Sequence, residues 1–104
     1  MSLDEICENV RQLSSEHGWD QVDPMSRMLH VTAEVGEVAH AVISLQATAK
    51  GHSETARLAL GHEIFDAIWN LCALATAAGV DIEQAARDKM AINAERVWPS
   101  DSAK

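Results

Sequence analysis

The sequence predicts an all-α fold, a four-helix bundle, from its composition, its apolar spacing and its turn residues. Ala, Leu, Val and Glu dominate a chain that is 47% hydrophobic but only 4% aromatic, which is typical of helical proteins. Apolar residues recur at helical spacing, and no segment has the pattern expected of a strand. Short loops divide the chain into four stretches. Its 104 residues have room for one domain, 1–104.

The first two expected helices are separated by a loop over 18–24. The first runs from about Leu3 to His17 and ends at Gly18, and its apolar face holds Leu3, Ile6, Val10 and Leu13. Pro24 suits the first turn of the next helix. That second helix runs from about Met25 to Ala49, with an apolar stripe made of Met28, Val31, Val35, Val38, Val42 and Leu45.

The third and fourth helices follow a short turn at 50–53 that contains Gly51. Ser53 is expected to cap the third helix, which ends with Gly79 in the C-terminal capping position. Asp81 caps the fourth, which runs to about Val97. Two long apolar helices in so short a chain leave hydrophobic surface exposed, so we expect a homo-oligomer that associates through apolar helix faces.

The charge and the cysteines indicate a soluble cytoplasmic protein. A net charge of −8 repels the phosphate backbone and argues against nucleic-acid binding. A small phosphorylated ligand stays compatible with that charge, because a bound divalent cation inverts the local electrostatics. Cys7 and Cys72 lack metal-ligand spacing, which is typical of reduced cysteines, with Cys72 in the core.

Neither a signal peptide nor a membrane span is expected. Asp4 and Glu5 interrupt the N-terminal region where a signal peptide needs apolar residues. The segment Leu58–Val80 is long and fairly apolar, but polar side chains within it make a membrane span costly: His62, Glu63, Asp66 and Asn70. We therefore expect it to form a buried helix of a soluble protein.

Two acidic pairs mark the candidate site. Glu34 and Glu37 are the only formally charged residues from Met28 to Ala49, and Glu63 and Asp66 are the only ones from Leu58 to Val80. Each pair has i, i+3 spacing, so both carboxylates lie on one helix face. Either pair alone reads best as a solvated face. Four clustered carboxylates would repel one another unless a cation lay among them, and oxygen ligands favour Mg²⁺, with Mn²⁺ as the alternative.

These residues carry a resemblance to a known family. Ala33-Glu34-Val35-Gly36-Glu37-Val38, followed by Glu63-Ile64-Phe65-Asp66, resembles the E-E-x-x-E … E-x-x-D signature of the MazG-like all-α nucleoside triphosphate pyrophosphohydrolases. The similarity continues through 79–85 to Lys89, Asn93 and Arg96, and Trp19-Asp20-Gln21 resembles a loop of the small dCTP-hydrolysing branch. It covers 19–99. Ala33 and His62 depart from it, since acids are common at both positions.

The resemblance implies Mg²⁺-dependent hydrolysis of (deoxy)nucleoside triphosphates to the monophosphate and pyrophosphate, as nucleotide-pool house-cleaning. Its catalytic and metal-binding residues would be Glu34, Glu37, Glu63 and Asp66. The metal would lower the pKa of an attacking water, and one carboxylate could act as general base instead of as a ligand. The implied partners are the nucleotide and further copies of the chain, in a homodimer or homotetramer.

Five further residues are candidates for substrate binding. Lys89, Asn93 and Arg96 share one face of the last helix and could hold the phosphates; the alternative is a solvated basic stripe. Trp19 could stack on a base. Asn70, one turn after Asp66, could contact the nucleotide or orient a metal ligand.

Two alternatives remain open at this point. The first is an enzyme resembling the phosphoribosyl-ATP pyrophosphohydrolases, which share the fold and the acidic motifs. The second is a helical dimerisation module without catalysis, whose acids are structural or face solvent. Mg²⁺ should raise the thermal stability of a four-carboxylate site but not that of such a module.

Overall fold

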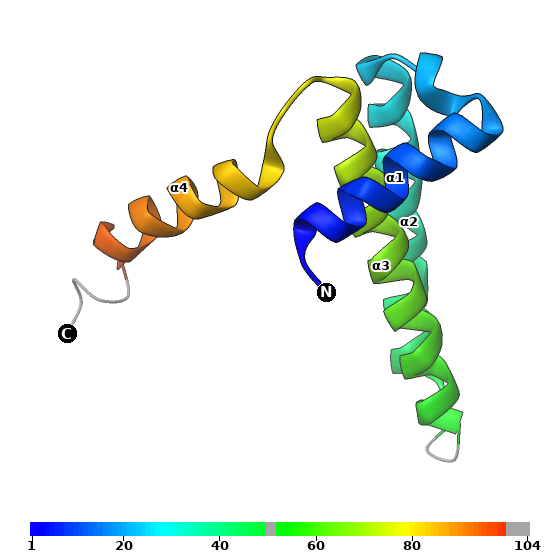
Figure 1. The fold of residues 1–104 in the computed structure, drawn as a ribbon. Coiled ribbons are helices and arrows are strands. Elements are labelled where there is room, and N and C mark those ends of the chain that lie inside the picture. The colour runs from blue at the N-terminus through cyan, green and yellow to red at the C-terminus, as the bar shows by residue number, and fades with distance from the viewer. Residues whose placement is uncertain (50–51, 100–104) are drawn as a thin grey trace.

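The computed structural model describes residues 1–49 and 52–99, and over these ranges the protein is all-α. Four helices follow one another, α1 (Leu3–His17), α2 (Pro24–Ala47), α3 (Ser53–Ala77) and α4 (Ile82–Glu95), with a short 3-10 helix, η1 (Trp19–Gln21), after α1 (Figure 1). No strand occurs in the described ranges. The predicted all-α class is confirmed.

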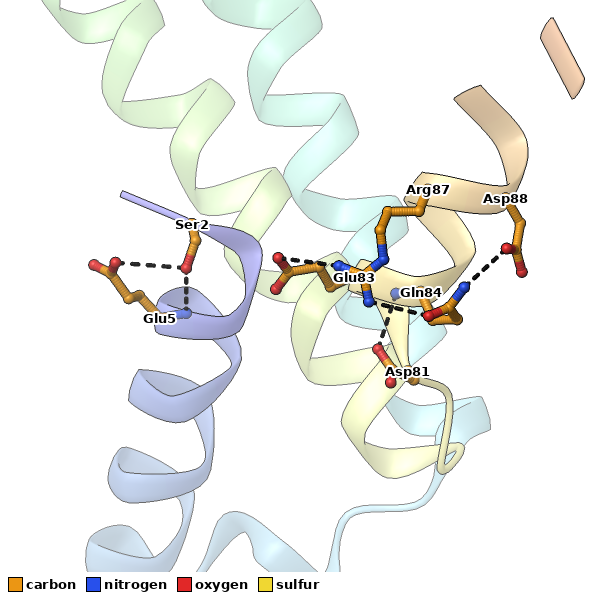
Figure 2. A network of polar contacts seen from close by, with 7 residues as sticks. All are labelled: Ser2, Glu5, Asp81, Glu83, Gln84, Arg87 and Asp88. Carbon is orange, nitrogen blue, oxygen red and sulfur yellow. Dashed lines mark hydrogen bonds and ion pairs between the residues drawn. The ribbon is translucent and has the colours of Figure 1, made fainter. Parts of the chain in front are cut away.

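Helix ends follow the local chemistry of the sequence at most positions. Gly18 ends α1 with φ 73°, in the left-handed region that glycine adopts without strain. Asp23 and Asp81 cap α2 and α4, accepting hydrogen bonds from the backbone N–H of Ser26 (2.8 Å) and of Gln84 (3.0 Å; Figure 2). The capping predictions for Gly18 and Asp81 are confirmed.

Two predicted helix ends and one predicted cap are wrong, whereas the predicted start of the third helix near Ser53 is confirmed. Helix α2 ends at Ala47 and α4 at Glu95, each two residues earlier than expected. Ser53 is the first residue of α3, and His52 precedes it at the cap position without a side-chain hydrogen bond. The predicted turn residue Gly51 lies outside the described residues.

Helices α2 and α3 form a long antiparallel hairpin, and α1 crosses α3 near one end of it (Figure 1). The core lies at this crossing and consists of Ile6, Cys7 and Val10 from α1 with Cys72 and Ala73 from α3. Val10 is 1% exposed and Cys72 is 2% exposed, which confirms the prediction for Cys72. Trp69 packs against this cluster.

The face that α2 turns towards α3 matches only part of the predicted stripe, in which Val38 and Leu45 are half-buried. Val31 is buried as expected, but Met28, Val35 and Val42 are exposed. The buried residues of α2 are Arg27, Val31 and Ala41, and half-buried Glu34 continues their helical spacing. The packed face of α2 therefore includes a buried cation and an acid.

Helix α3 is not the buried helix expected from its composition. Its most apolar window is only 17% buried, and several of its large side chains are exposed: Leu58, Ile64, Phe65, Ile68 and Leu71. With 25 residues and an 18-residue window whose mean hydropathy is 1.2, it is long and apolar enough to cross a membrane by length and composition alone. That is weak evidence, since core helices of soluble proteins meet the same criteria.

The fourth helix stands apart from the α2–α3 hairpin. It extends away from the end of α3, and its main packing is against α1 (Figure 1). The radius of gyration is 17.1 Å, whereas a compact domain of this length has about 13 Å. The four helices of one chain thus do not enclose one common core, which corrects the expectation of a closed bundle.

Candidate metal centre

Three of the four predicted carboxylates meet in the middle of the α2–α3 hairpin. One carboxylate oxygen from each of Glu34, Glu63 and Asp66 lies within 4.8 Å of the other two. Glu34 and Glu63 are half-buried, and Asp66 is exposed. Glu34 lies on the packed face of α2, and Glu63 and Asp66 come from one face of α3, so the packing of the two helices creates the cluster.

The electrostatics of Glu34 reflect this arrangement. Its pKa is raised above the ordinary value, first by desolvation and then by the negative charges of Asp66, Glu63 and Glu37, while His30 opposes the shift. A carboxylate whose neighbours are also acidic is stabilised by a proton or by a cation. The cluster is therefore a site where positive charge is favoured.

Glu37 lies beside this cluster rather than in it. Its side chain is exposed, and its oxygens are not among those that meet within 4.8 Å. Its charge nevertheless contributes to the raised pKa of Glu34. The structure thus brings three of the four predicted carboxylates together in one group and places Glu37 at its edge.

The geometry of the three carboxylates fits a small divalent cation. Mg²⁺ binds oxygens at about 2.1 Å, so ligand atoms in an octahedral shell lie roughly 3 to 4.2 Å apart. Oxygens within 4.8 Å of one another need only small rotamer changes to reach this spacing. An all-oxygen donor set favours Mg²⁺ or Mn²⁺ over softer metals.

Asn70 is placed next to the cluster, one turn beyond Asp66 on α3. Its Nδ2 donates a 2.8 Å hydrogen bond to the backbone carbonyl of Asp66, and its side chain is half-buried. The bond occupies one of the two amide protons and leaves the amide oxygen without a hydrogen bond to a described residue. A role for Asn70 towards a ligand stays a prediction.

The three predicted phosphate-binding residues lie elsewhere in the single chain. Lys89, Asn93 and Arg96 belong to α4 and its C-terminal cap, and α4 extends away from the hairpin (Figure 1). Arg96 lies over the Trp98 ring, 4.9 Å from its centroid, and Asn93 Oδ1 is buried without a hydrogen-bond partner in the described structure. The described structure of one chain therefore does not bring these residues to the carboxylates, and their role in phosphate binding stays a prediction.

Trp19 lies in η1 and lines a cavity of about 320 Å³ between α1, η1 and the hairpin. Its ring stacks on His17 with a centroid distance of 4.6 Å and is 42% exposed. The same cavity holds a residue that the sequence analysis missed, Arg27, which is only 7% exposed. The sequence feature that indicates its burial is the helical spacing of Arg27, Val31 and Glu34, which places the arginine on the face that packs against α3.

Comparisons with known proteins do not assign the chain to a family. No family model and no curated protein matches it. The resemblance to the pyrophosphohydrolases thus rests on the acidic motifs and their neighbours in the sequence.

Proposed function

We propose that this protein is a Mg²⁺-dependent hydrolase of (deoxy)nucleoside triphosphates that releases the monophosphate and pyrophosphate. The observation that supports it most is the meeting of Glu34, Glu63 and Asp66 oxygens within 4.8 Å. Two separate acidic motifs on two helices converge on one point, as a cation site requires. Among the described residues, no ion pair joins these three carboxylates to a Lys or Arg.

The residues of the cluster suit the two tasks of the reaction. Glu63 and Asp66 would hold the cation, which when bound neutralises phosphate charge and activates water. Water attacks the α-phosphorus, the α–β anhydride bond breaks, and pyrophosphate leaves with the bonding electrons. Glu34, whose carboxylate lies within 4.8 Å of those of Glu63 and Asp66 from the facing helix, would accept the proton of that water.

We also propose that the working protein is a homodimer or homotetramer. Large apolar side chains are exposed on α3, including Phe65 and Leu71, and on α4, including Met90 and Ile92, and such surface is typically covered by association. In an oligomer, α4 of one copy could bring Lys89 and Asn93 to the carboxylates of another. Because α4 lies away from its own hairpin, this would supply the phosphate contacts that one chain lacks.

The test is product analysis against a panel of nucleoside triphosphates, with Mg²⁺ and with EDTA. Glu34→Gln and Asp66→Asn should each lower kcat by about 100-fold or more, as expected for loss of a group that acts in the transition state. Glu54→Gln is the matched control, because Glu54 lies on α3 but is exposed and paired with Arg57. Release of inorganic phosphate without pyrophosphate, or full activity in EDTA, would contradict the proposal.

A second candidate is a helical dimerisation module without catalysis, which the exposed apolar side chains of α3 favour. It predicts association without turnover of any triphosphate. It also predicts that Mg²⁺ leaves the thermal stability of the protein unchanged, whereas binding at the carboxylates raises that stability by mass action.

A further inference from the structure

Arg27 is a buried cation without an acidic partner in the described structure. Its side chain lies between α2 and η1 and is 7% exposed. The ion pairs that the described residues form involve other arginines, all of them exposed: Arg11, Arg57 and Arg87. The hydrogen bond of its guanidinium runs from Nη2 to the backbone carbonyl of Trp19 and is long, at 3.4 Å.

This arrangement leaves most of the binding capacity of Arg27 unused. A guanidinium has five N–H donors, and one long bond to a carbonyl satisfies at most one of them. Nε and Nη1 of Arg27 have no hydrogen-bond partner among the described residues, and they remain accessible from the neighbouring cavity, where an anion could pair with the charge. The chain has a net charge of −8, yet none of its described acids pairs with this buried cation.

The unpaired guanidinium lines the cavity of about 320 Å³ beside Trp19. Hydroxyl groups of Ser14, Ser15 and Thr76 line it too, and Ser14 is buried with no side-chain hydrogen bond to a described residue. Arg11 also lines the cavity, although its charge is paired with Glu8 at 2.7 Å. A fork of N–H donors beside a buried hydroxyl matches the acceptor oxygens of a phosphate group.

One acid, Asp20, lines the same cavity. It is exposed, and no ion pair joins it to Arg27. Its charge is therefore largely screened by water.

We propose that this cavity is an oxyanion site of the phosphate class, in which Arg27 supplies the charge and Ser14 a hydroxyl donor. It is distinct from the carboxylate cluster: Arg27 precedes Glu34 by seven residues on α2, about 10 Å along the helix. The proposal does not rest on the proposed hydrolase activity. Free inorganic phosphate and the phosphoryl group of a larger ligand share the required chemistry.

The test is a titration with inorganic phosphate in the presence of EDTA, in which thermal unfolding gives the Tm at each phosphate concentration. A parallel titration with sodium chloride at equal ionic strength shows the effect of salt alone. Without a cation the carboxylate cluster repels phosphate, so saturable binding reports the Arg27 cavity. At phosphate tenfold above its Kd, we expect the Tm to rise by about 6 °C. The rise should vanish in Arg27→Met and persist in Arg57→Met, a matched control whose arginine is exposed.

Arg27→Lys keeps the positive charge but loses the planar fork, so it should bind phosphate about tenfold more weakly than wild type. If Arg27→Met fails to fold, Arg27→Lys and Ser14→Ala in the same titration decide the question. Tighter binding of ribose 5-phosphate than of phosphate would identify a larger ligand as the source, and equal binding would identify the free ion. No saturable stabilisation of the wild type, equal stabilisation by acetate, or an undiminished rise in Arg27→Met would overturn the proposal.

Discussion

The indole Nε1 of Trp69 donates a 2.9 Å hydrogen bond to Oδ1 of Asn9, joining residues sixty positions apart in the chain. Trp69 belongs to α3 and Asn9 to α1. The bond lies at the crossing of the two helices, where the buried core of the protein is found. It therefore fixes the position of α1 along the hairpin as well as adding to stability.

Asn9→Ala should lower the free energy of unfolding by about 0.5–1 kcal/mol, because the half-buried indole N–H loses its acceptor. Urea denaturation measures this change, and a double-mutant cycle with Trp69→Phe isolates the pairwise contribution. Gln12→Ala serves as the control, since Gln12 bonds only Glu16 within α1. A loss in Gln12→Ala as large as that in Asn9→Ala would contradict the argument.

The raised pKa of Glu34 predicts a pH dependence of stability. Its folded-state pKa lies above its ordinary value of 4.5, so between these two values the folded state binds more protons than the unfolded state. Stability from this group is thus fully present below pH 4.5 and is lost as pH rises through the folded pKa. Urea denaturation in EDTA from pH 4 to pH 8 should show this decline.

Glu34→Gln removes the titrating group, so the variant should lose less stability than wild type over the same pH range. Mg²⁺ should restore stability to the wild type at pH 8 and have a smaller effect on the variant. Identical pH profiles of stability for the two proteins in EDTA would show that the pKa of Glu34 is not raised in the folded state.

The thiol of Cys72 should be almost inert in the folded protein. Burial, followed by its neighbour Cys7, raises the pKa of Cys72 to about 11. At pH 8 about one thousandth of it is therefore thiolate, the reactive form. Alkylation by iodoacetamide, followed by mass spectrometry, should label Cys72 slowly in buffer and rapidly in urea. Fast labelling of the native protein would mean that α1 leaves α3 readily.

The contact between α1 and α4 includes two neighbouring carboxyl groups. The pKa of Glu83 is raised, chiefly by the neighbouring side chain of Asp4 and then by desolvation. Arg87 pairs with Glu83 at 3.5 Å and opposes the shift (Figure 2). Asp4→Asn should therefore lower the pKa of Glu83 and slow amide exchange in α4 at pH 7.

Carboxyl NMR titration measures the first effect and hydrogen exchange the second. Glu5→Gln is the control, because Glu5 interacts with Ser2 at the start of α1 instead of with α4 (Figure 2). An unchanged pKa of Glu83 in Asp4→Asn would show that the side chain of Asp4 does not act on Glu83.

The sequence predicted local features better than packing. Helix caps and the spacing of acidic residues depend on residues a few positions apart. The caps at Gly18 and Asp81, and the shared helix face of each acidic pair, could therefore be predicted from the sequence. The packed face of α2 could not, because apolar residues cover more than one face of that helix. Val35 and Val42 satisfy helical spacing as well as Val31 does, yet both are exposed.

The position of α4 relative to the other helices could not be predicted from the sequence either. Lys89, Asn93 and Arg96 share a helical face, and that prediction concerns only one helix. Where this face points depends on the connection at Gly79, which has φ 69°, and on the contact with α1. Arg27 was missed for a related reason: its charge suggested solvent, whereas its spacing with Val31 indicated burial.

Because α1 covers only one end of the α2–α3 hairpin, the two ends should open with different free energies. Near the crossing, Cys72 and Ala73 are 2% exposed, whereas towards Ala47 and Ser53 the buried side chain on α2 is Ala41. Amide protons should therefore exchange slowly around Cys72 and quickly towards the far end of the hairpin. The carboxylate cluster of Glu34, Glu63 and Asp66 lies between these two regions. A cation bound there would therefore slow amide exchange further along the hairpin, beyond the end that α1 covers.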